Sequence, residues 1–436
     1  MIISGHSFRF WNLFITLFQL ALVAQAKSAS GSRTLVIYDK RLTDLEDYST
    51  LFSNLGDRSF QLNYKPVSND STPIGLFQGE ERLYDNLIIF PIRSRHFNKQ
   101  LSVDKLLDFS NEGGHILTLS SPEATADNVR LFLNQLGIYP SPKNYHLEDY
   151  FQSGGDTPLR VSGSNVLNEH VVPSLKRDLI YGGSAALLDS SNLIVPVLQA
   201  PRTSFTKDSQ KHDENWTVGS QGYIVVSFQS LQNSRVSWVG SDLFFNDKYA
   251  SSNGQFVQEL MKWTFGEKSI VKSLGARHKH TNGLEYSDMP YKVKDDVIYE
   301  IGLTEWDGTS WAPFIAKDIQ FELKMIDPYY RITLKPSNSA PTAQYYTTGN
   351  FSLPDHHGIF TFTVDYKRSG LSFFTERDVK PIRHLANDEY PRSWEITNSW
   401  VYLTAIYSVI VAWALFVTLF LSFKRSHNVQ MEKKNN

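Results

Sequence analysis

One uncharged run of 24 residues, Trp400 to Phe423, constrains this chain more than any other feature. As a helix it would extend about 36 Å at ~1.5 Å per residue, enough to cross a hydrocarbon core of about 30 Å with some tilt. Lys424 and Arg425 follow the run directly, and acidic residues precede it. Because basic residues favour the cytosolic side, we expect a cytosolic C-terminus and residues 27 to about 398 on the opposite side of the membrane.

The N-terminal residues predict a cleaved secretory signal peptide. A mostly apolar stretch of 15 residues, Phe10 to Ala24, follows the weakly basic His6 and Arg9. Ala24-Gln25-Ala26 then presents small residues where signal peptidase needs them. Since the apolar stretch is short for a membrane span, we expect cleavage rather than an uncleaved anchor, with residues 1–26 removed.

The C-terminal tail, residues 425–436, ends in Lys433-Lys434-Asn435-Asn436. Lysines at the fourth and third positions from a cytosolic C-terminus resemble the dilysine retrieval signal of endoplasmic reticulum membrane proteins. The alternative is a basic tail attracted to anionic lipid. The position of both lysines favours retrieval, and it agrees with the orientation inferred from the span.

Three Asn-x-Ser/Thr triplets begin at Asn69, Asn215 and Asn350. Their number is what chance would give in a chain of this composition, so only the expected topology makes them possible glycosylation sites. Asn215 closes the polar run 207–215, which predicts a loop, and is the strongest of the three.

Residues 27–270 predict an α/β domain with a parallel sheet. Short apolar segments typical of buried strands alternate with segments of helical periodicity, so we expect a sheet covered on both faces, of the flavodoxin-like or amidotransferase-like kind. The predicted strands are 34–39, 61–66, 87–91, 115–120, 193–198, 222–228 and 235–242, and the predicted helices are 44–55, 103–109, 123–136 and 254–265.

Residues 271–392 predict a small antiparallel β-sandwich. Segments 297–303, 319–325, 330–334 and 358–366 are strand-like, with alternating apolar and polar residues, turns between them and no intervening helix. Residues 393–424 would comprise a linker and the membrane span, taken as 400–423.

The whole ensemble resembles one family. The segments Thr34-Leu-Val-Ile-Tyr-Asp39, Tyr84-Asp-Asn-Leu-Ile-Ile-Phe-Pro91 and Glu112-Gly-Gly-His-Ile-Leu117, the β module, the single span and the dilysine tail are similar to the type I, non-catalytic subunit of the eukaryotic oligosaccharyltransferase complex. This family is also described as the 48-kilodalton or Wbp-type subunit of dolichyl-diphosphooligosaccharide–protein glycosyltransferase. The resemblance covers the whole mature chain in order.

This resemblance implies membership of an endoplasmic reticulum complex that transfers a preassembled oligosaccharide from dolichyl diphosphate to Asn of nascent Asn-x-Ser/Thr segments. It also implies that the transfer chemistry and its divalent metal belong to a separate multispan subunit. Small membrane subunits would be further partners, the nascent polypeptide and lipid-linked oligosaccharide would be met indirectly, and no cofactor or metal is expected on this chain.

The composition itself argues against independent catalysis. The sequence has no cysteine, which excludes disulfides, Cys-ligated zinc and every thiol nucleophile. Ser120, Ser121 and Ser241 follow predicted strands without a Gly-x-Ser-x-Gly motif.

The pairs His278/His280 and His356/His357 lack the metal-binding His-Glu-x-x-His pattern, and we expect solvated loop histidines. The net charge of −2 argues against nucleic acid as a partner.

A binding role is a more open question. In a doubly wound sheet the ligand crevice lies at the carboxyl ends of the strands. That edge could hold a sugar or a peptide, although the same residues are typical of solvated strand ends. The residues expected there are Asp39, Lys40, Arg41, Arg93, Arg95, Ser120, Ser121, Glu123 and Asp242, with Asp39, Arg93, Ser120 and Asp242 the principal candidates.

The membrane span carries a stripe of small residues, Thr404, Ser408 and Ala412, with Ala405 alongside. Such stripes allow close approach between helices in lipid, whereas a monomeric anchor needs none. Two other functions stay open from the sequence: a membrane-anchored lumenal hydrolase, and a cargo receptor that cycles between compartments.

Overall fold

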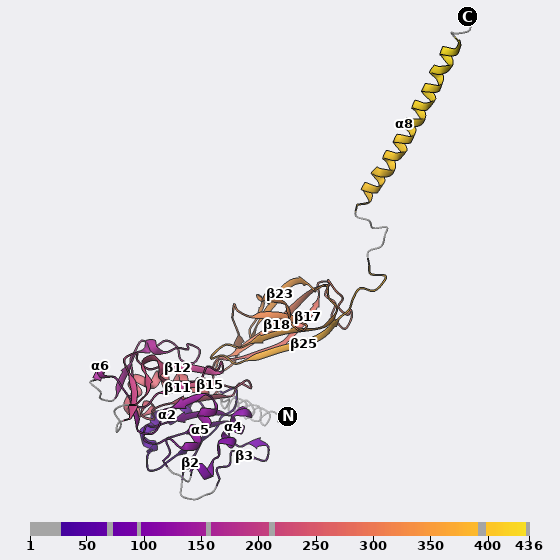
Figure 1. Ribbon diagram of the computed structural model, residues 1–436. Helices are drawn as coiled ribbons and strands as arrows, with labels where there is room; N and C mark the ends of the chain where they lie inside the picture. Colours follow the sequence, from indigo (N-terminus) through magenta and orange to yellow (C-terminus); the bar gives the residue numbers. More distant parts are fainter. Residues whose placement is uncertain are drawn as a thin grey trace, which may run out of the picture.

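The computed structural model describes residues 28–67, 73–93, 97–153, 158–208, 214–390 and 398–432. A large sheet with helices on both faces is followed by two smaller antiparallel sheets and a long separate helix (Figure 1). This order confirms the predicted fold class. The predicted signal peptide, the dilysine pair, Asn69 and Arg95 lie outside the described residues.

The large sheet of the α/β unit has nine strands. Its order is β2-β1-β5-β6-β16-β15-β11-β7, and β12 also pairs with β15. The first five strands in this order, β2, β1, β5, β6 and β16, run parallel to their neighbours among these five, as expected from their apolar sequences. The strands beyond β16 pair in the antiparallel sense. The strands are β1 (Arg33–Tyr38), β2 (Gln61–Pro66), β5 (Asn86–Ile89), β6 (His115–Leu119), β7 (Ile138–Pro140), β11 (Ala186–Leu188), β12 (Ile194–Gln199), β15 (Tyr223–Gln229) and β16 (Arg235–Val239).

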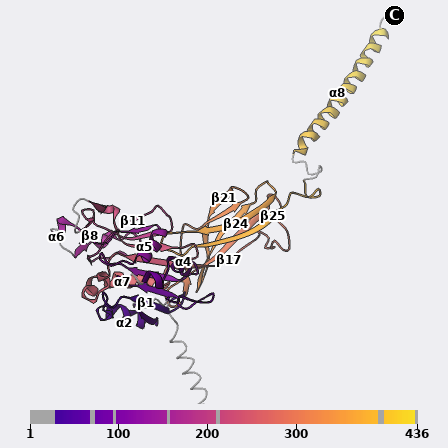
Figure 2. The ribbon, with the colours of Figure 1, turned by 60° about the horizontal axis from the view of Figure 1, so that its bottom comes forward.

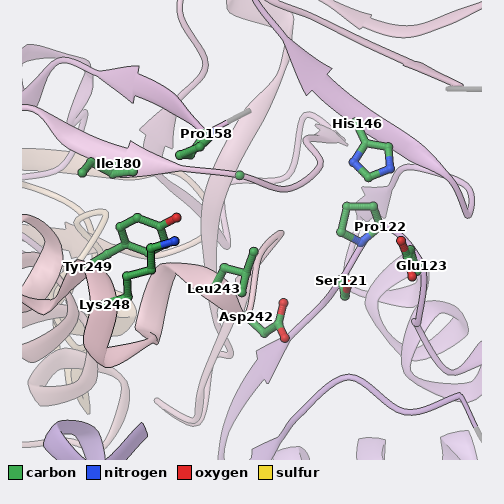
Figure 3. A pocket seen from close by; sticks show the side chains of 11 residues that line it. Ser121, Pro122, Glu123, His146, Pro158, Ile180, Asp242, Leu243, Lys248 and Tyr249 are labelled. Carbon is green, nitrogen blue, oxygen red and sulfur yellow. The ribbon is translucent and has the colours of Figure 1, made fainter. Parts of the chain in front are cut away.

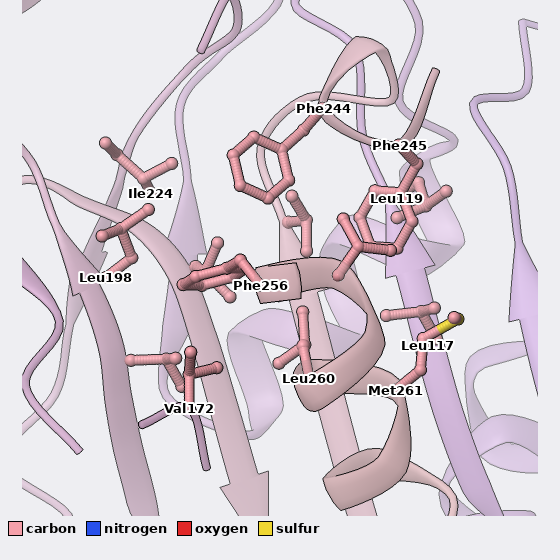
Figure 4. Close-up of a cluster of buried hydrophobic side chains, with 14 of the residues drawn as sticks. Leu117, Leu119, Val172, Leu198, Ile224, Phe244, Phe245, Phe256, Leu260 and Met261 are labelled. Atoms are coloured by element: carbon pink, nitrogen blue, oxygen red, sulfur yellow. The ribbon is translucent and has the colours of Figure 1, made fainter. Parts of the chain in front are cut away.

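Both faces of this sheet are buried, which explains why its strands are apolar throughout. In β1, Val36 packs into one core, while Leu35 and Ile37 pack into the core on the other face. On the first face, Phe256 and Leu260 of one helix fill the space above the strands (Figure 4). The helices are α2 (Ser49–Asp57) and α7 (Ala250–Thr264) on the first face, and α4 (Val103–Asn111) and α5 (Asp127–Gln135) on the second.

Three predicted helices begin elsewhere than expected, and one of them, α7, begins at Ala250 rather than at 254. Residues 45–48 form a 3₁₀ turn, η1 (Leu45–Tyr48), before α2. Helix α5 begins at Asp127 rather than at 123, because the amide of Ala124 donates to the carbonyl of Ser121 and closes a tight turn.

The segment from about 140 to 220 adds small elements around this sheet. It supplies a two-stranded sheet, β9 and β10, and a three-stranded sheet in the order β14-β13-β8. The remaining short elements are β3 (Phe77–Gln78), β4 (Glu81–Arg82), α3 (Phe97–Gln100), β8 (Tyr145–Glu148), α6 (Tyr150–Ser153), β9 (Leu159–Val161), η2 (Gly163–Asn165), β10 (Leu179–Tyr181), β13 (Phe205–Asp208), β14 (Asn215–Val218), η3 (Gly219–Gln221), η4 (Leu243–Phe245) and η5 (Asp247–Tyr249).

The β unit consists of two antiparallel sheets that share one core. One has the order β17-β18-β23-β22 with β19 beside β18, and the other is β21-β20-β24-β25. Tyr299 from the first sheet packs on Phe321 from the second, with ring centroids 4.5 Å apart. The strands are β17 (Ile270–His280), β18 (Asp296–Trp306), β19 (Trp311–Pro313), β20 (Gln320–Lys324), β21 (Pro328–Thr333), β22 (Lys335–Ala340), β23 (Ala343–Ser352), β24 (Gly358–Tyr366) and β25 (Phe374–Ile382).

The last element, α8 (Ser399–Glu432), is one continuous helix that stands apart from the sheets (Figure 2). Its part Ser399–Ser422 has a mean hydropathy of 2.2, and none of its most apolar window is buried by the described residues. It is long and apolar enough to cross a membrane, as the sequence predicts.

Candidate functional site

A pocket of about 360 Å³ opens at the carboxyl ends of β6 and β16. These two strands are parallel neighbours, with Leu119 beside Val239, so the loops that follow them meet at one edge of the sheet. The pocket is lined by Ser121, Pro122, Glu123, His146, Pro158, Ile180, Gly182, Asp242, Leu243, Lys248 and Tyr249.

Two glycines hold the wall of this pocket close to the sheet. A Cβ on Gly240 would lie 2.1 Å from the carbonyl oxygen of Ser184, and one on Gly183 would lie 2.4 Å from the carbonyl oxygen of Gly240. Neither contact is sterically possible, so only glycine permits the two loops to approach in this way. Gly183, which follows the lining residue Gly182, therefore helps to shape the pocket.

Asp242 provides a partly buried carboxylate at the base of the pocket. It directly precedes η4, and its Oδ2 accepts a hydrogen bond from the hydroxyl of Tyr48 at 3.4 Å. Burial raises the pKa of Asp242, although hydrogen bonds from backbone amides and from Tyr48 partly oppose that rise. The same surroundings raise the pKa of Tyr48, first through burial and then through the nearby carboxylate, so the Tyr48 hydroxyl stays protonated.

The other polar groups come from separate elements. Lys248 and Tyr249 of η5 lie on one side, and His146 of β8 lies with Pro122 and Glu123 on the other, with Asp242 and Leu243 between them (Figure 3). Carboxylates accept hydrogen bonds from hydroxyl or amide groups, while an ammonium donates them. Rings and prolines offer apolar contact, so the pocket fits a small polar ligand with an apolar face.

The structure brings together three of the expected crevice residues, Ser121, Glu123 and Asp242. Ser120 is buried instead, and its Oγ accepts a hydrogen bond from Nε1 of Trp238 at 2.8 Å. Ser241 is also buried, and its hydroxyl donates to the carbonyl of Gly182. These two serines therefore hold neighbouring segments together.

Asp39 and Arg93 lie together at the ends of β1 and β5, outside the pocket lining. Oδ1 of Asp39 accepts from the amide of Arg41 at 3.1 Å, and Oδ2 accepts from the amide of Arg93 at 3.4 Å. Asp39 is only 4% exposed, so its carboxylate stabilises a turn. The expected edge thus divides into a turn at β1 and a pocket at β16.

The sequence does not predict the other eight lining residues, among them His146, Pro158, Lys248 and Tyr249. Of these four, the first two belong to or border the small sheets inserted between β7 and β15, and the other two form a 3₁₀ turn before α7. Strand-end reasoning finds only residues that follow parallel strands, so insertions that fold back over the edge leave no such signal.

The expectation that His278 and His280 are loop histidines is wrong. Both lie on β17, with the His278 side chain 5% exposed and His280 4% exposed. In His278, Nδ1 lies 2.8 Å from the Tyr291 hydroxyl and Nε2 lies 2.8 Å from Oδ2 of Asp378. His278 and His280 alternate along the chain with the charged Arg277 and Lys279, and such alternation is typical of a strand. His356 and His357 are exposed in a loop, as expected.

Two of the three possible glycosylation sites are described, and both asparagines are exposed. Asn215 is the first residue of β14 rather than a loop residue, and Asn350 lies on β23. The hydroxyl of Thr217 is buried and lies 2.8 Å from that of Thr206, so this triplet is accessible as a whole only before β14 pairs with β13.

Comparison with known proteins identifies the family of the chain. Residues 25–267 match the model of the OST48 N-terminal domain, and residues 278–424 match that of the OST48 middle domain. The chain is 50% identical over 415 residues to dolichyl-diphosphooligosaccharide–protein glycosyltransferase subunit WBP1 of Saccharomyces cerevisiae, covering 94% of this chain and 96% of that protein. It is 30% identical over 429 residues to the 48 kDa subunit of the same enzyme from Drosophila melanogaster, covering 92% of this chain and 93% of that protein. The chain therefore belongs to the OST48 family.

Proposed function

We propose that this chain is an accessory, non-catalytic subunit of the oligosaccharyltransferase complex of the endoplasmic reticulum. The observation that carries the proposal is the 50% identity to a subunit of that glycosyltransferase along nearly the whole of both chains. The chain would support transfer of oligosaccharide from dolichyl diphosphate to Asn-x-Ser/Thr segments by assembling with the multispan catalytic subunit and with small membrane subunits.

The proposal includes a type I topology. Residues 1–26 would be removed, the α/β domain 27–270 and the β domain 271–392 would lie in the lumen, and residues 393–424 would form the linker and span. Basic residues after the span support this orientation. The tail 425–436 would return the protein to the endoplasmic reticulum through Lys433 and Lys434. Asn215, Asn350 and Asn69 would then face the compartment in which glycans are added.

A non-catalytic role is supported by the contacts of two of the three strand-end serines. Ser120 accepts a hydrogen bond from Trp238, and Ser241 donates one to Gly182, so both hydroxyls serve packing rather than attack on a substrate. The sequence also offers no cysteine nucleophile. The reactive centre would belong to another subunit.

The pocket beside Asp242 would bind part of a substrate. The carboxylates of Asp242 and Glu123 can accept hydrogen bonds from sugar hydroxyls or peptide amides, and Tyr249 offers a ring for apolar contact. Binding here would hold donor or acceptor near the catalytic subunit without any bond being made or broken on this chain.

The main test is co-purification followed by an activity assay. We expect the tagged full-length chain to purify in stoichiometric amounts with a multispan glycosyltransferase subunit. The assembled complex should transfer oligosaccharide from a dolichyl diphosphate donor to an acceptor peptide, whereas the isolated chain should not. Transfer by the isolated chain, or purification without the multispan subunit, would overturn the proposal.

The pocket is tested with Asp242→Asn and Glu123→Gln in the assembled complex. Loss of one hydrogen bond of about 0.5–1.5 kcal/mol predicts a two- to tenfold rise in KM for donor or acceptor with little change in kcat. Asp104→Asn, an exposed carboxylate on α4 outside the pocket lining, is the control. Unchanged KM values in a normally assembled complex would exclude substrate binding at this pocket.

A further inference from the structure

A second pocket, of about 330 Å³, lies between the α/β unit and the β unit. His115 and Arg235, the first residues of β6 and β16, line it, so it lies at the opposite edge of the large sheet from the pocket beside Asp242. The β unit supplies another part of the wall through the start of β17 and through Trp311 of β19. All of the described residues that line this pocket are neutral or basic. Ligand sites are common where two units meet, so the pocket is a candidate for a second site.

His115 brings an unpaired hydrogen-bond donor to this pocket. The residue is 3% exposed, and its Nδ1 accepts a hydrogen bond from the amide of Arg235 at 3.1 Å. Burial lowers the pKa of the ring to about 3, so the ring is neutral at physiological pH and carries its one proton on Nε2. Among the described residues, Nε2 has no hydrogen-bond partner. Because a buried donor without a partner is unfavourable, this position needs an acceptor.

Gly266 keeps space open beside this donor. A Cβ on Gly266 would lie 2.7 Å from Oγ of Ser30 and 3.5 Å from Nε2 of His115. Gly266 also has a φ of 68°, which side chains rarely adopt. The hydroxyl of Ser30, which lines the pocket as well, therefore lies near Nε2 across a space that only glycine leaves free. Both groups can donate to an acceptor in the pocket.

The pocket also carries positive charge that no nearby carboxylate balances. The guanidinium of Arg235 is buried, donates to three backbone carbonyls and forms no ion pair with a described residue. Lys272 is exposed at the edge of the pocket and forms no ion pair with a described residue either. Asp85, whose charge acts on His115, is already paired with Arg33 at 2.8 Å. Since buried charges are normally paired, these surroundings favour an anion.

We propose that this pocket binds a small organic carboxylate. The carboxylate accepts a hydrogen bond from Nε2 of His115 and lies near the ammonium of Lys272. The buried charge of Arg235 attracts it without contact, through an interior of low dielectric. The aliphatic part of the ligand lies against the ring of Trp311 and the side chain of Ile270, which also line the pocket. The site lies apart from the pocket beside Asp242, so its test is independent of the proposed function.

The first test measures binding to the full-length chain in lipid nanodiscs, by saturation-transfer NMR at constant ionic strength. Butyrate is the probe, acetate is its shorter homologue, and butyramide has the same shape without the charge. We expect saturable binding of butyrate, at least threefold tighter than that of acetate because of the apolar contact. Butyrate should also bind at least tenfold tighter than butyramide because of the charge. The absence of saturable butyrate binding, or equal affinities for butyrate and butyramide, would overturn the inference.

The second test locates the site with two matched lysine variants. Lys272→Met removes the ammonium and should raise the Kd for butyrate at least fivefold. Lys317→Met, which removes an exposed lysine of the same unit outside the pocket lining, should leave that Kd unchanged. Saturating butyrate should also raise the unfolding temperature of Lys317→Met more than that of Lys272→Met, because a ligand that binds only the folded chain stabilises it. Equal Kd values in the two variants would place binding elsewhere and overturn the inference.

A third variant tests the apolar wall. Trp311→Ala should abolish the preference for butyrate over acetate while leaving the affinity for acetate within about twofold of wild type. A folded Trp311→Ala variant that keeps the full preference would contradict the proposed orientation of the ligand. If this variant does not fold, the comparison of Lys272→Met with Lys317→Met still decides whether the carboxylate binds here.

Discussion

The α/β unit and the β unit are joined in a different way from the β unit and α8. At the first connection, the loop between β24 and β25 docks on the α/β unit through hydrogen bonds that are buried or partly buried, apart from the exposed one of Asn168. They run from Asn168 to Ser369, from Trp263 to Gly370, from Gln229 to Leu371 and, in both directions, between Asn233 and Phe373. At the second connection, the chain leaves β25 past an exposed ion pair of Arg383 with Glu389.

A buried arginine reinforces the first connection. Arg235 is 1% exposed, its guanidinium donates to the carbonyls of Trp263, Lys268 and Ser269 at 2.7–2.8 Å, and it stacks 4.4 Å from the Trp263 ring. Burial lowers its pKa to about 9, so the group stays charged at neutral pH. It therefore fixes the segment that leads from α7 into β17.

We call the first connection, between the α/β unit and the β unit, the joint, and the second connection, between the β unit and α8, the tether. The ten residue-to-residue steps from Glu389 to Ser399 can reach at most about 34 Å at ~3.4 Å per step, which limits how far the β unit can lie from the span. The orientation of the α/β pocket relative to the β unit is thus set by packing and hydrogen bonds, whereas the number of residues between Glu389 and Ser399 sets only an upper limit on the distance from the β unit to α8.

Removing Trp263 should break the rigid joint most severely. Trp263→Ala deletes a fully buried ring and its hydrogen bond to Gly370, so we expect a loss of about 3–5 kcal/mol in the free energy of unfolding. Trp263→Phe keeps most of the ring and should cost less, about 1–3 kcal/mol for the carbonyl left unpaired. Chemical unfolding of the purified chain followed by circular dichroism measures both. Equal stability of Trp263→Ala and wild type would mean that the joint is not buried in solution.

Asn233 offers a sharper test of the same joint. Its side chain exchanges two hydrogen bonds with the backbone of Phe373, at 2.6 and 2.8 Å, and its own backbone has φ 67°. Asn233→Gly tolerates that backbone and removes only the amide, so we expect a loss of about 1–3 kcal/mol. Asn233→Ala adds the cost of the left-handed conformation, about 1 kcal/mol more. An alanine variant as stable as the glycine variant would contradict the positive φ.

The sequence was sufficient for the parts of the fold that repeat a simple rule. Buried strands such as β1 and β6 are apolar without interruption, and α4 ends before a glycine pair, so their positions follow from local pattern. The joint could not be predicted, because Asn233 and Phe373 are 140 residues apart and look like ordinary turn residues. In the pocket, Asp242 and Ser121 follow parallel strands and are predicted by that rule, whereas His146 comes from the insertion between β7 and β15 and is not.

Acid should weaken the joint through His115. This ring is buried beside Arg235, whose amide donates to its Nδ1 at 3.1 Å; burial first, and then the charge of Arg235, lower its pKa to about 3. Because the unfolded chain binds the proton more tightly, the stability that the neutral ring provides is complete above pH about 6.5 and falls as the pH drops toward 3, by up to about 1.4 kcal/mol per pH unit. His115→Gln should flatten the slope of unfolding free energy against pH between 6 and 4. An unchanged slope would assign the acid sensitivity to other groups.

The smallest effect is expected at the tether, from Glu389→Gln. The Glu389 carboxylate accepts two hydrogen bonds of 2.7 Å from Arg383 and one of 2.8 Å from the amide of Ala386, which lower its pKa to about 2. Its contribution is therefore present above pH about 4.5 and is lost only as the pH falls toward 2. Because exposed ion pairs contribute little, global unfolding should not change at neutral pH. The hydrogen bonds of Glu389 with Arg383 and Ala386 form a clamp that holds residues 383–389 against the β unit. Without this clamp, limited proteolysis should cleave faster beside Tyr390. Asp388→Asn, an exposed neighbour, should leave that rate unchanged; equal acceleration by both variants would show that charge, not the clamp, protects the tether.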